Sequence, residues 1–180
     1  MVRGQRATLR SDMAKHHSSG MYRLIGAVGT NRLVTRVHPH VYRATGGRWF
    51  VGRNFGVLNV IVTMTGRSSG RLREVPLYAF EDGARLVVIG SNAGSDREPA
   101  WVGNLRANPS ASVRVGTVVR RMRAREVDGE ERDRLWGLAA GGYPGYELYR
   151  TMTDRHIPVV VLEPVAEPAH EPAPEPPGEG

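Results

Sequence analysis

Short runs of apolar and β-branched residues, separated by turns that contain glycine, fill the middle of this chain. They lie at residues 57–65, 72–81, 85–91, 111–116, 118–127 and 157–162. Runs of this length and composition predict β-strands. Consecutive strands joined by short turns cannot be parallel, and six such strands can curl into a small barrel. The sequence therefore predicts an α+β, mainly β fold with a six-stranded, mostly antiparallel barrel, and it excludes a doubly wound sheet.

Helices are expected at the rim of this barrel. Residues 99–107 have helical character and end at Asn108-Pro109. Asp128 followed by Glu131 resembles a capping box that opens a helix running to about residue 140. Residues 143–153 suggest one more short helix. Between the second and third strands, residues 81–84 have the composition of a hairpin turn.

The two ends of the chain differ from its middle. Residues 1–20 are polar, basic and aperiodic, which indicates a flexible arm. Residues 21–45 predict two short helices that cover a sheet edge or rest on a membrane surface. Residues 164–180 continue a Glu-Pro repeat with a four-residue period, which predicts a disordered tail. We therefore expect one folded domain at residues 21–163.

Composition limits the chemistry that is available. The chain of 180 residues has no cysteine, which excludes disulfides, thiolate metal sites and a cysteine nucleophile. The histidines lack ligand spacing, so no metal site is expected. No apolar run approaches a membrane span, and the N-terminus lacks the apolar segment of a signal peptide, so the expected compartment is the cytoplasm.

The net charge of +7 is unevenly spread. Five Glu and no basic residue lie between Glu163 and the C-terminus, which leaves residues 1–162 at +12. A field of this sign attracts nucleic acid, anionic lipid or a small ligand with several phosphates or carboxylates. Composition does not choose among these three.

The densest polar cluster is residues 63–73, Thr-Met-Thr-Gly-Arg-Ser-Ser-Gly-Arg-Leu-Arg, after the first predicted strand. Its glycines can expose backbone N–H groups, while hydroxyls and three arginines add donors and charge, so it is a candidate phosphate cradle. It lacks the Gly-Lys-Ser/Thr end of a P-loop, and a strand follows where a nucleophile elbow needs a helix. The alternative is an ordinary polar hairpin loop.

Two smaller clusters lie further along the chain. Residues 91–94, Ser-Asn-Ala-Gly, follow the third predicted strand and can place a hydroxyl against a planar ligand, or form only a turn. Tyr143, Tyr146 and Tyr149 are spaced by three, so their rings project from one side of a helix. These phenols can form the wall of an aromatic binding site and donate a proton, or they can pack on the core.

Taken in order, these clusters resemble the deazaflavin-dependent nitroreductase family, in its F420H2-dependent quinone reductase-like form. The resemblance covers residues 58–164 and rests on 60–70 with Arg73, Pro76 and Tyr78, on 99–109 including Trp101, on 143–155, and on 157–160. It implies a split β-barrel of the flavin-reductase type that binds coenzyme F420, with the phosphate and polyglutamate tail held by basic residues. It also implies hydride transfer to a quinone-like, nitro-aromatic or activated-alkene acceptor.

The same resemblance assigns roles to residues. It places the tail at Arg67 and Arg73, and it implies further coenzyme contacts from Thr65, Gly66, Ser68, Ser69, Gly70, Pro76, Asn92 and Trp101. Ser91 is expected near the deazaflavin ring, and Tyr78, Tyr143, Tyr146 and Tyr149 around the ring and acceptor, with Tyr146 as proton donor. The family often has lysine at the positions of Ser68 and Asn92, so two cations near the tail are missing here.

Two other functions stay open at this point. An FMN enzyme on the same barrel is one alternative. The other is a non-enzymatic nucleic-acid binder, which is suggested by the arginines at 120, 121, 123 and 125 around one strand. The sequence does not distinguish a monomer from a homodimer.

Overall fold

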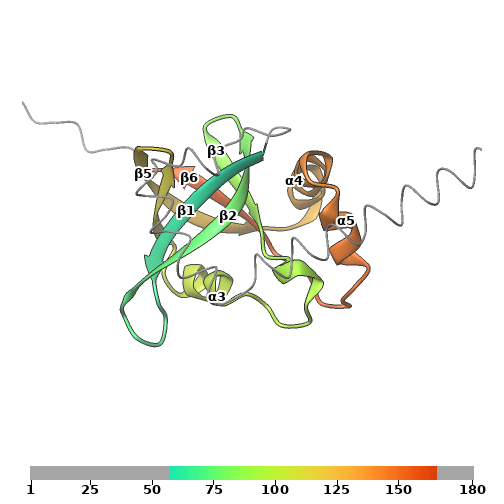
Figure 1. The fold of residues 1–180 in the computed structure, drawn as a ribbon, viewed down its shortest axis with the longest axis horizontal. Coiled ribbons are helices and arrows are strands. Elements are labelled where there is room, and N and C mark those ends of the chain that lie inside the picture. Colours follow the sequence, from blue (N-terminus) through green and yellow to red (C-terminus); the bar gives the residue numbers. More distant parts are fainter. Residues whose placement is uncertain (1–56, 166–180) are drawn as a thin grey trace, which may run out of the picture.

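The computed structural model describes residues 57–165, in which six strands form a closed barrel (Figure 1). The strands are β1 (Val57–Thr65), β2 (Leu72–Asp82), β3 (Arg85–Ile89), β4 (Ser110–Val115), β5 (Val118–Val127) and β6 (Val159–Pro164). Their order around the barrel is β1-β2-β3-β6-β5-β4, and β4 closes on β1. Every pairing among these strands is antiparallel, which confirms the predicted barrel.

Tight turns set the register of two hairpins. Asp82 pairs with Arg85 across the β2–β3 turn, where Gly83 adopts a φ of 65°. Val115 pairs with Val118 across the β4–β5 turn, where Gly116 has a φ of 60°. Residues with side chains adopt this left-handed backbone only with strain, which explains glycine at both places.

Helices cover one end and one side of the barrel. Figure 1 shows α3 (Ala100–Ala107) below the barrel, and α4 (Gly129–Gly142) and α5 (Gly145–Arg150) beside it. A single 3-10 turn, η1 (Asn92–Gly94), follows β3. The predicted helix at 143–153 is shorter than expected, because Tyr143 ends α4 and Pro144 precedes α5.

Strand alternation produces two cores. The inner cluster fills the barrel and includes Val62, Met64, Val88 and Leu162, with Trp101, Val102 and Leu105 of α3 closing one end. The outer cluster lies between the barrel wall and α4–α5; it contains Phe80, Val87, Val159 and Val161 from the strands, and Leu135, Trp136, Tyr146 and Tyr149 from the helices. Strands β3 and β6 contribute to both clusters, which explains why their sequences are almost continuously apolar.

The predicted capping box is wrong. Asp128 occupies the N-cap position of α4, but its side chain makes no capping hydrogen bond. The carboxylate of Glu131 instead accepts hydrogen bonds from Arg125, at 2.8 and 3.1 Å, and from Arg85, at 3.2 Å. Two arginines from distant strands are stronger partners for a carboxylate than a local backbone N–H.

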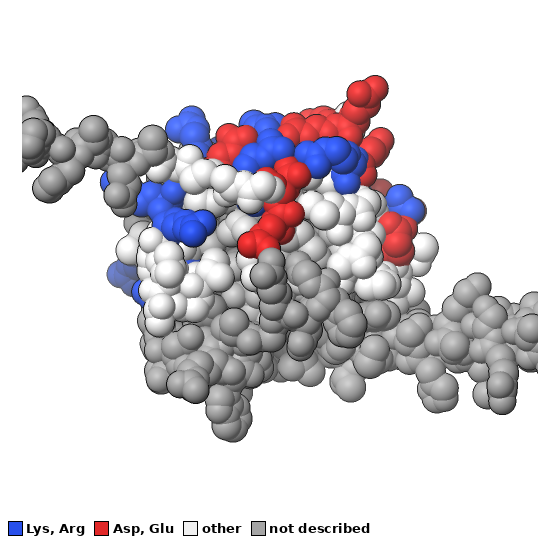
Figure 2. All heavy atoms as spheres, turned by 90° about the horizontal axis from the view of Figure 1, so that it is seen from above, with Lys and Arg blue, Asp and Glu red and all other residues white. Residues whose placement is uncertain are grey.

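Ion pairs neutralise much of the positive charge on the barrel. Residues 57–165 hold 15 arginines and 13 acidic residues, so their net charge is +2, whereas residues 1–56 hold ten basic residues and one acidic residue. Figure 2 shows basic and acidic side chains next to one another along one edge of the face in view. Most of the +12 charge of residues 1–162 therefore belongs to residues 1–56, and the described barrel by itself is only weakly cationic.

The C-terminal boundary is later than the sequence suggested. Pro164 pairs with Met122 of β5, and the N–H of Val165 donates to the carbonyl of Arg121 at 3.0 Å. The first Glu-Pro pair therefore belongs to the fold, although residues 164–180 were expected to form the tail. The predicted arm at 1–20, the helices at 21–45 and the rest of the tail lie outside the described residues.

No helix among residues 57–165 combines the length and the apolar character needed to cross a bilayer. Within the same residues, no group of three or more histidine or acidic side chains is arranged to hold a metal ion.

Candidate functional site

The Tyr cluster, which we define as Tyr78, Tyr143, Tyr146 and Tyr149, lies where β2 meets the ends of α4 and α5. The ring of Tyr143 is 5.3 Å from that of Tyr78 and 5.1 Å from that of Tyr146, between centroids. The ring of Tyr149 is 6.2 Å from those of Tyr143 and Tyr146. The structure therefore brings the three predicted phenols together with Tyr78, although they do not share one helix.

The hydroxyl groups of this cluster are not equivalent. The Oη atoms of Tyr143 and Tyr149 are hydrogen-bonded at 3.1 Å. Tyr146 is only 5% exposed and packs against Phe80 and Trp136. Within residues 57–165 its hydroxyl has no hydrogen-bond partner, although the Oη is not among the fully buried, unsatisfied polar atoms.

Burial keeps these phenols protonated. It is the main cause that raises the pKa of Tyr146, and also that of Tyr143, where the hydrogen bond between the Tyr143 and Tyr149 hydroxyls raises the pKa further. A phenol whose pKa is raised in this way stays neutral at physiological pH and is available as a hydrogen-bond donor.

The Arg loop, which we define as residues 66–73, joins β1 to β2 and corresponds to the predicted phosphate cradle. Its glycines do not present free amides as expected. The Gly66 N–H donates to the carbonyl of Arg71, and the Gly70 N–H to the carbonyl of Gly66, both at 2.8 Å. Gly70 has a φ of 64°, so these bonds hold the loop in a tight turn.

The donors that the Arg loop does offer are side chains. Arg67, Arg71 and Arg73 are exposed and have no carboxylate partner within residues 57–165. The Ser69 hydroxyl lies 3.4 Å from Nη2 of Arg73 and from the backbone N of Arg71. Three cations on one short loop, none of them neutralised by a carboxylate of residues 57–165, suit an anionic ligand.

Helix α3 fixes one of these arginines. The N–H of Arg67 donates to Oδ1 of Asn104 at 3.1 Å. The guanidinium of Arg67 lies across Gly103, where a methyl group would come within 1.7 Å of Nη1. Glycine at 103 therefore makes room for Arg67, a function that the sequence gave no sign of.

The Ser91 loop, residues 90–95, follows β3. Ser91 is 6% exposed, and Asn92, Ala93 and Gly94 have φ values of 47°, 54° and 78°. The Nδ2 of Asn92 donates to the carbonyl of Arg97 at 2.7 Å. The loop touches α5, because a methyl group on Gly94 would lie 3.2 Å from the carbonyl oxygen of Tyr149. Ser91 is thus on the same side of the barrel as the Tyr cluster.

The other predicted residues lie on the same elements. Thr65 ends β1 and pairs with Leu72, while Pro76 and Tyr78 lie two residues apart on β2 and so share its outer face. Ser68 is exposed in the Arg loop. Trp101 is 7% exposed and packs in the inner cluster, which accounts for it as a core residue. Its coenzyme contact stays a prediction.

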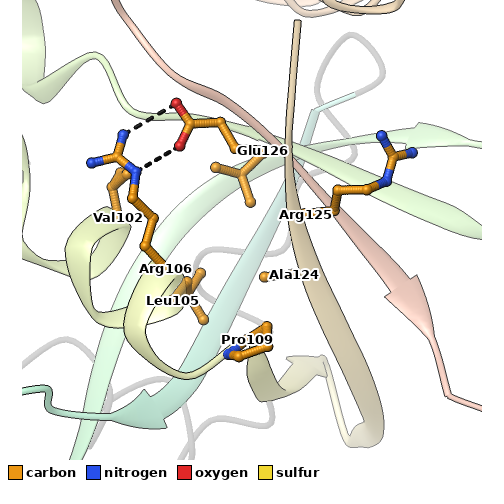
Figure 3. Close-up of a pocket in the computed structure, with 8 residues that line it drawn as sticks. Val102, Leu105, Arg106, Pro109, Ala124, Arg125 and Glu126 are labelled. Carbon is orange, nitrogen blue, oxygen red and sulfur yellow. Dashed lines mark hydrogen bonds and ion pairs between the residues drawn. The ribbon is translucent and has the colours of Figure 1, made fainter.

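A hollow of about 210 Å³ lies elsewhere, between α3 and β5. Figure 3 shows Arg106 and Glu126 facing each other at its edge, while Arg125 points away. Arg106 binds Glu98 at 2.9 Å and Glu126 at 2.7 Å, so its charge is already neutralised. The hollow is smaller than usual cofactor sites and contains no predicted site residue, so we do not assign the coenzyme to it.

The nucleic-acid alternative is weakened by the same kind of pairing. Arg125, one of the four arginines that suggested it, binds Glu131 at 2.8 Å and Glu163 at 3.1 Å.

Comparison with known proteins places this geometry in a family. A family model described as F420H(2)-dependent quinone reductase matches residues 34–164. An F420H(2)-dependent quinone reductase of Mycobacterium tuberculosis is 32% identical over 132 residues, which cover 71% of this chain and 87% of that protein. A second protein of that organism, named a putative F420H(2)-dependent quinone reductase, is 33% identical over 98 residues, covering 54% and 82%.

Two solved structures are similar as well. An F420-H2 dependent reductase matches with a TM-score of 0.55 and 42% identity, covering 58% of this chain and 93% of that one. A structure described as a domain-swapped dimer matches with a TM-score of 0.58 and 37% identity, covering 71% and 96%. The unneutralised arginines of the Arg loop and the unpartnered Tyr146 hydroxyl are compatible with an anionic redox coenzyme. The chain belongs to the F420H(2)-dependent quinone reductase family.

Proposed function

We propose that this protein transfers a hydride from reduced F420 to a quinone-type acceptor bound at the Tyr cluster. Because the chain belongs to this family, it is an oxidoreductase and its coenzyme is F420. The observation that carries the assignment of the site is Tyr146, which is 5% exposed among aromatic rings and whose hydroxyl makes no hydrogen bond within residues 57–165. An acceptor oxygen at this place would receive a hydrogen bond from a phenol that makes none to residues 57–165.

The role of Tyr146 follows from its protonation. When bound, the reduced deazaflavin supplies two electrons as a hydride. The quinone oxygen then gains negative charge, and a neutral phenol aimed at that oxygen stabilises it by a hydrogen bond and donates a proton. Because burial raises the pKa of Tyr146, the phenol stays neutral and can donate a hydrogen bond to that oxygen.

The other tyrosines orient the reactants. Tyr143 and Tyr149 bond to each other, so their hydroxyls are less available than that of Tyr146. Their rings and the ring of Tyr78 present flat apolar faces against which a planar acceptor can stack. Stacking in one orientation makes the transfer effectively intramolecular.

The Arg loop anchors the anionic end of the coenzyme in this proposal. Arg67 and Arg73 bind its phosphate and carboxylates, and the hydroxyls of Thr65 and Ser69 add donors. Ser68 and Asn92 contribute neutral contacts where relatives often have lysine, so we expect coenzyme binding to depend strongly on the remaining arginines.

The identity of the acceptor is tested by comparing three classes of substrate. Quinones, nitro-aromatic compounds and activated alkenes all accept a hydride into an electron-poor π system. Family membership favours a quinone. We expect kcat/KM to be highest for a naphthoquinone, with a nitro-aromatic compound and an activated alkene as comparison substrates. We also propose a homodimer, on the example of the domain-swapped neighbour, to be tested by light scattering of the purified full chain.

The decisive experiment is an anaerobic titration and assay of the full chain with F420. Oxidised F420 fluorescence reports binding, and reduced F420 with a naphthoquinone reports turnover. Arg73→Ala should weaken binding about tenfold, whereas Arg123→Ala on β5, which removes the same charge from an exposed strand position, should not. Tight binding of FMN in place of F420, or retention on DNA without any fluorescence change, would overturn the proposal.

A further inference from the structure

The guanidinium of Arg155, between α5 and β6, donates only to backbone carbonyls within the described residues. Its Nη2 donates to the carbonyls of Ser91 at 3.0 Å, Gly90 at 3.2 Å and Ser95 at 3.2 Å. Its Nε also reaches the Ser95 carbonyl at 3.3 Å, and Nη1 the carbonyl of His156 at 3.1 Å. No carboxylate within residues 57–165 pairs with it. The guanidinium therefore acts as a clamp on the Ser91 loop.

The loop that it clamps has an unfavourable backbone. Asn92 and Ala93 carry side chains, yet both have positive φ, and Gly94 continues the left-handed run. Such conformations persist when surrounding contacts over-determine them. The segment between α5 and β6 makes one further hydrogen bond to this region. The Thr153 hydroxyl donates to the carboxylate of Asp96, directly after the loop, at 2.7 Å. Arg155 makes most of the hydrogen bonds that connect this segment to the Ser91 loop.

The clamp acts on two parts of the proposed site at once. Ser91 lies at the bend and is 6% exposed. Three residues further, Gly94 lies so close to α5 that a methyl group on it would be 2.9 Å from Cβ of Met152 and 3.2 Å from the carbonyl oxygen of Tyr149. A shift of this loop would therefore move Ser91 and press on the helix that carries Tyr146 and Tyr149.

We infer that Arg155 is a positioning residue: by holding the carbonyls of Gly90, Ser91 and Ser95 it fixes Ser91 and α5 relative to each other. This inference rests on the proposed function for its effect on catalysis. Its structural part, the clamp, stands independently. Arginine suits the task because its planar fork directs several N–H groups at once, whereas the ammonium of lysine is a single point from which these carbonyls cannot all be reached.

The first test is proteolysis, which needs no coenzyme. Arg97 is exposed directly after the loop, so trypsin can cut between Arg97 and Glu98 when the loop is released. We expect Arg155→Ala to be cut there about tenfold faster than the natural chain, with Arg155→Lys between them. Cutting after Arg71, in the distant Arg loop, serves as the internal reference and should not change.

The second test is kinetic. Arg155→Ala should lower kcat about tenfold and leave the F420 dissociation constant within about threefold, because the Arg loop is intact. Added guanidinium should restore part of kcat, and sodium at equal ionic strength should not. The matched control is Arg150→Ala, which removes a surface pair with Glu147 on α5 and should leave both values unchanged.

The outcomes separate the two proposals. If the natural chain neither binds F420 nor turns it over, the proposed function fails, and the proteolysis still decides the clamp. If cutting after Arg97 is unchanged, or if it rises while kcat stays the same, the positioning role is wrong. If Arg155→Ala does not fold, as judged by circular dichroism, Arg155→Lys is measured in the same way and the same results decide.

Discussion

Replacing Gly103 with alanine should separate the fold's stability from coenzyme binding, because the two are expected to change in opposite directions. The new methyl group would overlap the guanidinium of Arg67, and the three atoms nearest to its position all belong to that side chain. The side chain of Arg67 is long and exposed, so it can swing away with little effect on packing. Alanine within a helix is favoured over glycine by about 0.5–1 kcal/mol. We therefore expect Gly103→Ala to raise the free energy of unfolding by up to about 1 kcal/mol.

Coenzyme affinity should fall in the same variant. A hydrogen bond to a charged group contributes about 1.5–3 kcal/mol, and less when the pair is exposed. Arg67 is exposed, so we take about 1–1.4 kcal/mol, which corresponds to about a fivefold to tenfold rise in the F420 dissociation constant. Fluorescence titration measures this rise, and urea denaturation measures the stability.

Gly137→Ala is the matched control. Gly137 lies in α4, and no atom lies within 4 Å of the methyl position, so the variant should gain the same helix stability without any change in F420 binding. A second control is the double variant with Arg67→Ala, in which Gly103→Ala should have no further effect on affinity. An unchanged dissociation constant in Gly103→Ala, together with a raised one in Arg67→Ala, would show that Arg67 does not bind the coenzyme from its position across α3.

Three further predictions concern the Tyr cluster, a surface ion pair and the outer core. Tyr146→Phe should lower kcat about 100-fold and leave the F420 dissociation constant within about twofold, because it removes a proton donor and keeps the ring; equal rates in stopped-flow measurements would remove Tyr146 from the mechanism. The pKa of Asp82 is lowered from 3.8 to about 2, chiefly by the hydrogen bond from Arg134, so its carboxylate stabilises the fold above pH 4 and this contribution is lost as the pH falls toward 2. Asp82→Asn should therefore cost about 1 kcal/mol at pH 7 after allowance for solvent screening, and urea denaturation at lower pH should show the difference shrinking. Leu135→Ala, at a fully buried position of α4, should cost about 3 kcal/mol, whereas Leu138→Ala, at a 39% exposed position on the same helix, should cost less than about 1 kcal/mol.

Local sequence patterns were sufficient to predict the strands. The bounds of β1 and β5 agree with the expected runs, and Gly83 forms the hairpin turn that its neighbours indicated. These features depend on residues that are close in sequence, such as alternating apolar side chains or one glycine with positive φ. The predicted capping box failed for the opposite reason, since the partners of Glu131 come from β3 and β5.

The candidate site was predictable only in part. Spacing alone suggested that Tyr143, Tyr146 and Tyr149 lie together, and the structure confirms their contact. The contact with Tyr78 depends on how α4 and α5 pack on β2, which spacing does not reveal. Arg155 and Gly103 were missed because their partners are more than thirty residues away in the chain. Arg155 belongs to the segment 143–155 that carries the family resemblance, but the resemblance assigned it no role.

Strand β2 links the two halves of the proposed site, and its register decides whether they can serve one ligand. Arg73 at one end belongs to the Arg loop, and Tyr78, five residues further, belongs to the Tyr cluster, so the two are separated by about 17 Å of extended strand and, at this odd spacing, lie on opposite faces of it. Side chains alternate between faces: Leu77 and Ala79 contact the inner cluster, while Tyr78 and Phe80 contact the outer one. A slip of one residue would turn Tyr78 into the barrel and an apolar residue toward α5. The long pairing of β2 with β1, from Leu72 to Phe80, opposes such a slip and thereby maintains the spacing between the arginines and the phenols.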